Sequence, residues 1–304
     1  MAKILVVGSI NMDLVLRVPH SPVPGETILG SNFQTFPGGK GANQAVAAAR
    51  MGGEVTLIGK VGNDDFGKVL TQGLVENKVI TDYVVKDPDA RTGIAMIIVA
   101  DNGENMIALA SGANMNISTD DIQKEEDLFS KTNLLMAQLE TPLPAMIKAV
   151  ELAHAHNVLV VLDPAPAQPL PDSFLEQVDV LTPNESELAI LTGEDDIDRG
   201  IKILRDRGVK NVVVTLGAKG ARLVNETTDL YIPSYKVVPV DSTAAGDAFN
   251  GALAVALAEG KSLVEAAQYG MAAGALATTK SGAQPSLPTR EAVERMMADP
   301  TFND

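Results

Sequence analysis

Six short apolar runs, rich in Val, Ile and Leu, recur along the chain. They cover residues 3–10, 54–61, 133–139, 157–162, 178–181 and 211–216. Each run is nearly continuous, which is typical of a strand covered on both faces. Between the runs lie segments with helical spacing, among them 42–51, 66–77 and 143–156. This alternation predicts a three-layer α/β/α fold, in which a mostly parallel sheet lies between two layers of helices.

Two regions depart from this rhythm. Residues 14–36 alternate polar and apolar positions and contain Pro19, Pro22 and Pro24, and residues 92–112 have the pattern of a hairpin with its turn at 102–103. Both predict antiparallel strands that form a small β lid beside the parallel sheet. Because one face of such a lid needs cover from a ligand, a domain or another subunit, we expect a homodimer formed through it. No repeat or linker divides the chain, so we expect a single α/β domain over residues 1–304 with the lid strands inserted.

The composition of the chain excludes several classes of binding partner and metal site. The 304 residues include 24 Lys and Arg against 39 Asp and Glu, a net charge of −15, which would repel a nucleic-acid backbone or an anionic bilayer. There is no cysteine, which excludes disulfides and thiolate metal sites and agrees with a reducing compartment. No stretch approaches the ~18 uncharged apolar residues of a membrane span, and the N-terminus lacks a signal-peptide pattern. We therefore expect a soluble cytoplasmic protein without nucleic-acid or membrane partners.

The strongest candidate for chemistry is the segment DSTAAGDAFNG at 241–251, which leads into an apolar helix. Ligands of open α/β sheets bind beyond the carboxyl ends of the strands, where this segment is expected. Small residues before a helix leave backbone N–H groups open to an anion, and the helix N-terminus adds partial positive charge. Asp247, in the first turn, is suited to take a proton from a hydroxyl that faces this anion. A lone Asp could simply complement the helix dipole, but the preceding Ala-Ala-Gly favours function.

Two further segments could hold a polar ligand. In PGGKGANQA, at 37–45, the glycines allow close backbone approach and Asn43 offers both a donor and an acceptor. The segment does not match a Walker loop, and alone it could be only a tight turn; nor does VVGSINMD, at 6–13, match the dinucleotide fingerprint. Asn11 and Asp13 follow the first strand at alternate positions, from which both could reach the hydroxyls of a sugar. Judged alone, this pair fits an ordinary turn equally well.

Asn184 and Glu187 follow another strand and share one face of a helix, where they could orient water around Mg²⁺. On geometry alone, however, an N-cap with a capping-box Glu is the better interpretation. The Gly-rich turn at 215–220 suits a phosphate or nucleotide, or simply a hairpin into 221–224.

Taken together, these segments resemble the ribokinase family of carbohydrate kinases. The resemblance runs through SINMDLV, GETILG, FPGGKGANQAVAAARMG, QLE, TPNESE, TLGAKG, DSTAAGDAFNGAL and SGAQPS, in this order. Gly-Gly-x-Gly-x-Asn followed later by Ala-Gly-Asp is specific as a pair. The resemblance implies transfer of the γ-phosphoryl group of ATP to the primary hydroxyl of a sugar, here the 5-hydroxyl of D-ribose.

The resemblance also implies a role for each matching residue. Asp247 would be the general base, and the amides of Ala244, Ala245, Gly246 and Asp247 would form an anion hole. The sugar would be bound by Asn11, Met12, Asp13, Gly39, Lys40, Gly41, Ala42, Asn43 and Glu140, together with Asp247. ATP would be bound by Asn184, Glu187, Thr215, Leu216, Gly217, Ala218, Lys219 and Gly220, together with Gly246 and Asp247.

Two cations are implied as well. Mg²⁺ would lie near Asn184 and Glu187 through water. An activating monovalent cation such as K⁺ would be bound by the Asp241 carboxylate, the Ser286 hydroxyl and the carbonyls of Thr243, Ala277, Lys280 and Gly282. Met271 departs from the Asn or His common near the adenine in this family. Other interpretations are a kinase for fructose, a deoxysugar or a nucleoside, and a non-catalytic sugar-binding regulator on the same fold.

Overall fold

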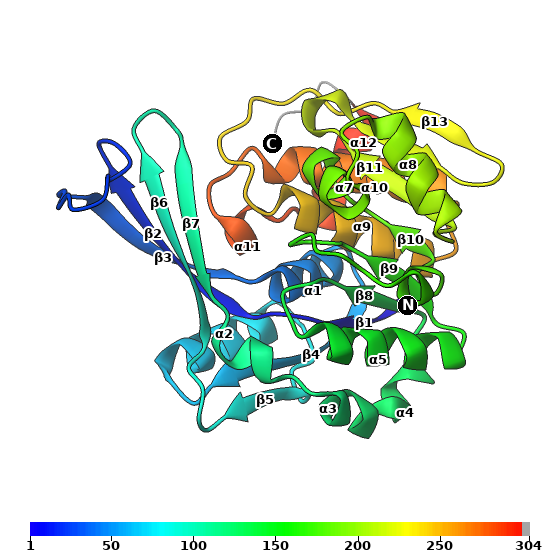
Figure 1. Ribbon diagram of the computed structural model, residues 1–304, viewed down its shortest axis with the longest axis horizontal. Helices are drawn as coiled ribbons and strands as arrows, with labels where there is room; N and C mark the ends of the chain where they lie inside the picture. Colours follow the sequence, from blue (N-terminus) through cyan, green and yellow to red (C-terminus); the bar gives the residue numbers. More distant parts are fainter. Residues whose placement is uncertain (300–304) are drawn as a thin grey trace.

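The computed structural model describes residues 1–299 and contains a large and a small β-sheet (Figure 1). The large sheet has the strand order β13-β12-β11-β10-β9-β8-β1-β4-β5. Its strands are β1 (Lys3–Val7), β4 (Glu54–Gly62), β5 (Val84–Asp87), β8 (Leu134–Ala137), β9 (Leu159–Leu162), β10 (Val180–Leu181), β11 (Asn211–Thr215), β12 (Ala221–Val224) and β13 (Asp229–Ile232). The strands from β11 to β5 run parallel, and β12 and β13 extend the sheet antiparallel. The prediction of a mostly parallel sheet is confirmed.

Helices cover both faces of this sheet. One face carries α1 (Lys40–Arg50), α2 (Asp65–Glu76), α9 (Ala245–Ala258), α10 (Leu263–Ala277) and α12 (Arg290–Ala298), and α11 (Ala283–Ser286) adjoins this layer. The other carries α3 (Thr119–Lys124), α4 (Glu126–Phe129), α5 (Leu143–Ala155), α6 (Asp172–Leu175), α7 (Glu185–Thr192) and α8 (Ile197–Asp206). Along β1, Ile4 and Val6 pack in the first layer, whereas Leu5 and Val7 pack in the second. Burial on both faces explains why the strand sequences are continuously apolar.

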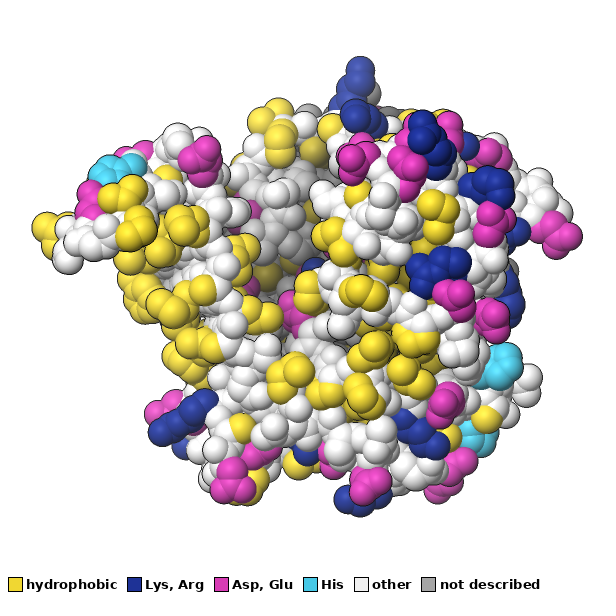
Figure 2. All heavy atoms as spheres, in the orientation of Figure 1, with side chains coloured by type: hydrophobic (Ala, Val, Ile, Leu, Met, Phe, Trp, Pro, Cys, Tyr) yellow, Lys and Arg dark blue, Asp and Glu magenta, His cyan; other side chains and the backbone are white. Residues whose placement is uncertain are grey.

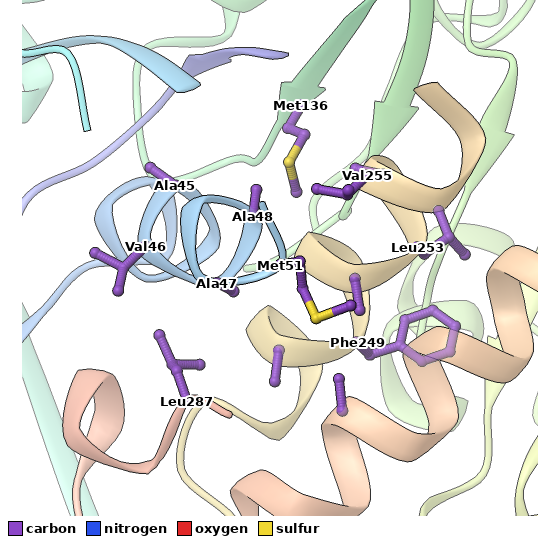
Figure 3. Packing of buried hydrophobic residues seen from close by; sticks show 14 of the residues in the cluster. Ala45, Val46, Ala47, Ala48, Met51, Met136, Phe249, Leu253, Val255 and Leu287 are labelled. Carbon is purple, nitrogen blue, oxygen red and sulfur yellow. The ribbon is translucent and has the colours of Figure 1, made fainter. Parts of the chain in front are cut away.

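The first layer is packed from small side chains. Figure 3 shows Ala47, Ala48 and Met51 of α1 pointing toward α9, with Val255 and Phe249 on the α9 side. Small residues on facing helices allow their backbones to approach closely. None of the helices within residues 1–299 is long and apolar enough to cross a membrane.

The small sheet stands apart from the large one, at the left of Figure 1, and we call it the lid. Its strands, in the order β3-β2-β6-β7, are β2 (Asn11–Val18), β3 (Ser31–Gly38), β6 (Gly93–Ala100) and β7 (Asn105–Ala110). As predicted, a tight turn at 102–103 joins β6 to β7, with Gly103 at φ 87°.

In one respect the expected lid is wrong, because the sheet is not wholly antiparallel. Its outer pairs are antiparallel, but the central strands β2 and β6 run parallel. These two strands are joined by a long crossover that includes β4 and α2, and such a connection permits parallel pairing where a hairpin does not. The sequence pattern shows where each hairpin turns, but it does not show how two distant segments pair.

The first strand is shorter than expected. It ends at Val7, and residues 8–10 cross from the large sheet to the lid, where β2 begins at Asn11. The crossing is tight, because a Cβ atom on Gly8 would lie 2.7 Å from the Cα of Gly41. Asn11 and Asp13 therefore belong to a lid strand rather than to a loop after β1.

Candidate active site

The N-termini of α1 and α9 meet beneath the lid. A Cβ atom on Gly251 of α9 would lie 2.4 Å from the Cβ of Ala47 in α1, so the two backbones are in close contact there. Asp247 and Asn43 lie about one helical turn before this contact, and the Asn43 Nδ2 donates to the Asp247 Oδ2 at 2.9 Å. Figure 2 shows the surface hollowed between lid and body above this region, with acidic side chains in its depth. Close helix packing thus holds the candidate base at the floor of a cleft.

The turn before α9 presents free amides. Ala244 has φ 61°, a left-handed conformation that costs a residue other than glycine about 1 kcal/mol or more. Within residues 1–299 the N–H groups of Ala244, Gly246 and Asp247 have no hydrogen-bond acceptor. The Ala245 N–H donates to the Ser242 carbonyl at 3.2 Å. Three of the four amides expected to bind an anion are therefore available, and no atom lies within 4 Å of a Cβ built on Gly246.

Buried amides surround Asp247 on its other side. Gln44 Nε2 donates to Asp247 Oδ1 at 3.1 Å and to Asp163 Oδ2 at 2.7 Å. Gln138 Nε2 in turn donates to Gln44 Oε1 at 2.7 Å. The sequence analysis missed Gln44, Gln138 and Asp163. The last two each directly follow a buried strand, which is the position at which ligand-binding residues were expected, so the signal was present.

A second cluster of hydrogen bonds forms around Glu140. Its Oε2 accepts from the Ser9 hydroxyl, from the Lys40 amide at 3.1 Å and from Asn11 Nδ2 at 3.4 Å. Asn114, in the segment that follows the lid, donates to Asn11 Oδ1 at 2.7 Å. The structure thus brings together Asn11, Lys40 and Glu140 as expected, and it adds Ser9 and Asn114, which the sequence analysis did not identify.

Asp13 reaches this cluster from the lid. A Cβ atom on Gly38 would lie 2.3 Å from an Asp13 carboxylate oxygen, so glycine is needed beneath that side chain. Burial, together with the charges of Glu140 and Asp247, raises the pKa of Asp13 to about 7. Nearby, the Asn43 Oδ1 is buried without a hydrogen-bond partner. An orphaned acceptor beside buried carboxyls fits a ligand that supplies hydroxyl groups.

Lys40 lies among four acidic side chains. Burial opposes its charge, but the carboxylates of Asp163, Asp247, Glu140 and Glu187 outweigh burial and raise the pKa of Lys40. Burial raises the pKa of Asp163 to about 8, to which Glu187 and Asp247 add, while Lys40 opposes the rise. The ammonium group therefore stays charged in the cleft, where it can attract an anion.

The remaining residues predicted to bind the sugar also have packing roles near the start of α1. Met12 points into the hydrophobic core, and the buried Ala42 donates its N–H to the Ser9 carbonyl at 2.9 Å. A Cβ atom on Gly41 would lie 2.5 Å from the backbone of Gly8. Gly39, at φ 87°, starts α1 in a conformation that favours glycine. These contacts shape the turn, and a sugar-binding role for these residues stays a prediction.

The two segments expected to bind ATP lie side by side. Asn184 and Thr215 form a parallel bridge. Asn184 and Glu187 form the capping box anticipated on geometry, with each side chain bonded to the other residue's amide at 2.8 Å. After Thr215 and the buried Leu216 comes a 3₁₀ turn, Gly217–Lys219, that contains Ala218 and closes at Gly220. Because the capping box uses only one Glu187 oxygen, the other is available for a metal-bound water.

Asp241 connects two loops behind the free amides. Its Oδ1 accepts from the Thr243 amide and hydroxyl, and its Oδ2 accepts from the Gly282 amide at 2.9 Å. Burial raises the pKa of Asp241, but these hydrogen bonds and the charge of Arg17 outweigh burial and lower it. Ala277, Lys280 and Ser286 belong to the same C-terminal segment, and the Ser286 hydroxyl donates to the Ala283 carbonyl. One carboxylate with hydroxyl and carbonyl oxygens is a donor set that fits a monovalent cation.

Comparison with known proteins identifies the family of the chain. The model of the pfkB family of carbohydrate kinases matches residues 1–290. A ribokinase of Haemophilus influenzae is 43% identical over 291 residues, which are 94% of this chain and 95% of that protein. A ribokinase structure from Thermotoga maritima has a TM-score of 0.91 and 38% identity, and covers 98% of this chain and 100% of its own. The structure of Arabidopsis thaliana ribokinase complexed with ribose and ATP has a TM-score of 0.90 and 33% identity, and covers all of both chains. The chain therefore belongs to the pfkB family of carbohydrate kinases.

Proposed function

We propose that this kinase transfers the γ-phosphoryl group of ATP to the 5-hydroxyl of D-ribose, giving ribose 5-phosphate and ADP. The observation that carries the proposal is the position of Asp247. Its carboxylate accepts from Asn43, whose buried Oδ1 lacks a donor, and the open amides of Gly246 and of Asp247 itself can bind an anion. A sugar hydroxyl and a phosphoryl group supply these two partners. The ribose and ATP described for the A. thaliana relative support the same pair.

In the proposed reaction Asp247 accepts the proton of the 5-hydroxyl as that oxygen attacks the γ-phosphorus. The bond between the γ-phosphorus and the β,γ-bridging oxygen breaks, and its electron pair leaves with ADP. Charge spreads over the oxygens of the transferring group, toward which the amides of Gly246 and Asp247 donate. The charged Lys40 favours the approach of the anionic phosphate.

The ring hydroxyls of the sugar would be bound by Asn11, Asp13, Asn43 and Glu140. Their buried oxygens and amides discriminate strongly, because a polar group left without a partner in the closed site costs about 1–3 kcal/mol. Asp13, with a pKa near 7, can either donate or accept at neutral pH.

ATP would lie along Asn184 and the turn at 215–220, a proposal supported by the parallel bridge between Asn184 and Thr215. Asn184 and Glu187 would hold Mg²⁺ through water, and Asp241 with its neighbouring oxygens would hold a monovalent cation. When bound, Mg²⁺ neutralises phosphate charge and the monovalent cation supports the amide turn from behind. Through its hydrogen bonds to Thr243 and Gly282, Asp241 itself already joins the two loops.

We propose in addition that two copies pair through the lid. Leu14, Met96 and Ala108 are register partners and share one face of the sheet, as do Leu16, Ile98 and Met106. Asp13 points to the opposite face, toward the cleft. Near the body the apolar face packs on the core through Met12 and Leu14, and farther along the lid it is exposed, as at Met106. Met96 is 54% exposed. Figure 2 shows hydrophobic side chains gathered along the lid, and a second copy would cover such a patch.

The test is ADP release with MgATP and D-ribose in potassium buffer, beside 2-deoxyribose, fructose, xylose and a ribonucleoside. We expect fast release that is selective for ribose, and slower release when a large organic cation replaces potassium. Selective release with another sugar would keep the mechanism but refute ribose as the substrate. If folded protein releases no ADP across the panel, the proposal fails in favour of a non-catalytic sugar-binding protein.

A further inference from the structure

Resting on the proposed function, we infer that Gln44 is a positioning residue, whose side-chain amide fixes the orientation of the Asp247 carboxylate for proton transfer. None of the catalytic or binding roles assigned above involves Gln44. It follows Asn43 in α1 and is only 1% exposed, so neither solvent nor the sugar accounts for its amide.

The Gln44 amide has a hydrogen-bond partner in the site for both of its hydrogens and for its oxygen. Its nitrogen has two hydrogens, and the two acceptors are Asp247 Oδ1 at 3.1 Å and Asp163 Oδ2 at 2.7 Å. Its oxygen accepts from Gln138 Nε2 at 2.7 Å. All three contacts are side chains near the reacting position. A buried glutamine needs partners for its amide, and here the site supplies all of them.

The two acids determine which way the Gln44 amide faces. A carboxylate accepts hydrogen bonds, so the Gln44 nitrogen points toward Asp247 and Asp163, and its oxygen is left to accept from Gln138. If the amide turned over, its oxygen would face two carboxyl groups, and two buried donors would be lost, each at a cost of about 1–3 kcal/mol.

Both oxygens of the Asp247 carboxylate accept a hydrogen bond from α1. Asn43 binds Oδ2 and Gln44 binds Oδ1, so consecutive residues of one helix hold both ends of the carboxylate. Held at both oxygens, the group cannot rotate about its Cβ–Cγ bond without breaking a buried hydrogen bond. Displacing a reacting group by about 1 Å can reduce the rate by about 100-fold. Asn43 alone would leave one end of the carboxylate free to move.

The decisive variant is Gln44→Met, which preserves side-chain volume and removes both donors. We expect kcat to fall by about 10- to 100-fold, while the dissociation constants of ribose and of a non-hydrolysable ATP analogue, measured by calorimetry, change by less than about threefold. The matched control is Gln72→Met. Gln72 is also a helical glutamine that donates to a carboxylate, Glu76, but it is exposed and distant from the site, so its kcat should not change.

A folded Gln44→Met variant with wild-type kcat would overturn the inference, as would a parallel loss of kcat and both affinities, which indicates a structural role. If that variant does not fold, Gln138→Met decides: it removes the donor to the Gln44 oxygen, one of the three contacts that hold the amide, and we expect about a tenfold loss of kcat with unchanged affinities. An unchanged kcat there refutes the inference. Failure of the proposed function is separate, because it appears as wild-type protein that does not phosphorylate ribose.

Discussion

Strands β8 and β7 have similar apolar sequences but opposite environments. All four residues of β8, LLMA, are buried, whereas all six residues of β7, NMIALA, are exposed. Strand β8 lies in the middle of the large sheet between two helical layers, whereas β7 is an edge strand of the lid without helices over it. Apolar sequence therefore indicates that a strand needs cover, but it does not say whether the chain itself supplies that cover.

The body of the protein and the lid therefore have different roles. The body fixes side chains by packing, as the Gly251 contact fixes Asp247 against Asn43. The lid contributes Asn11 and Asp13, and its outer face remains apolar and exposed. We therefore expect changes in the body to reduce the rate of chemistry, and changes on the outer face of the lid to alter association.

Asp247→Asn tests the body most severely. Asparagine keeps the shape but cannot accept the proton, so we expect kcat to fall by about 10²- to 10⁴-fold. Ribose affinity, measured by calorimetry, should stay within a few-fold. The matched control is Asp65→Asn, because Asp65 is also an acid in the first turn of a helix, α2. Should the two variants behave alike, Asp247 would be no more than a helix-dipole residue.

Gly251→Ala tests whether close helix packing holds the site. The added methyl group would lie 2.4 Å from the Cβ of Ala47 and 2.8 Å from the Ala48 amide, so α1 and α9 must separate. We expect a loss of about 1–3 kcal/mol in the free energy of unfolding, measured with urea, together with a lower kcat.

Gly73→Ala is the control for this change. Gly73 is also a helical glycine, but nothing lies within 4 Å of an added Cβ. Alanine there should stabilise the protein by about 0.5–1 kcal/mol. Equal effects at the two glycines would contradict the role assigned to the packing contact.

The sequence alone predicted the main layers of this body well. Continuous apolar runs identified the central strands because burial on both faces leaves no position for a polar residue. The capping box joins Asn184 and Glu187, which are close in the sequence, so their spacing was sufficient to predict it. Family resemblance, rather than periodicity, assigned roles to Asp247 and the anion-binding turn, and these roles stay predictions.

Long-range pairings were harder to predict. The parallel pairing of β2 with β6 depends on a crossover rather than on either strand's residues. The contacts of Gln44 with Asp163 and Gln138 join three elements, and no spacing within one segment encodes them. Side-chain networks between elements are therefore the part of the site that required the structure.

Met96→Lys tests whether the outer face of the lid mediates association. A lysine in a paired lid face can extend its charge to solvent, so we expect the dimer to weaken by about tenfold rather than to disappear. Sedimentation velocity over a concentration series measures this change. Ile190→Lys, at a residue of α7 that is 58% exposed, is the control and should leave association unchanged. If only Ile190→Lys weakens the dimer, the lid is not the interface.

The smallest expected effect comes from Asp163, a buried acid of the body site. Its pKa rises from 3.8 in the unfolded chain to about 8 in the folded protein, chiefly through burial. The folded state thus binds a proton more tightly, and the stability contributed by Asp163 is present at low pH and is lost as pH rises between about 4 and 8. Asp163→Asn removes this titration.

Asparagine can still accept the Gln44 hydrogen bond, so the packing of the site should survive the substitution. We expect the free energy of unfolding of Asp163→Asn, relative to wild type, to rise by about 1 kcal/mol between pH 7 and 8. Urea unfolding at pH 5, 6, 7 and 8 measures the difference. Asp13, with a pKa near 7, titrates in both proteins and cancels in the comparison. Parallel pH profiles would mean that water or Lys40 keeps the Asp163 carboxylate charged, and that this part of the body is more open than its packing implies.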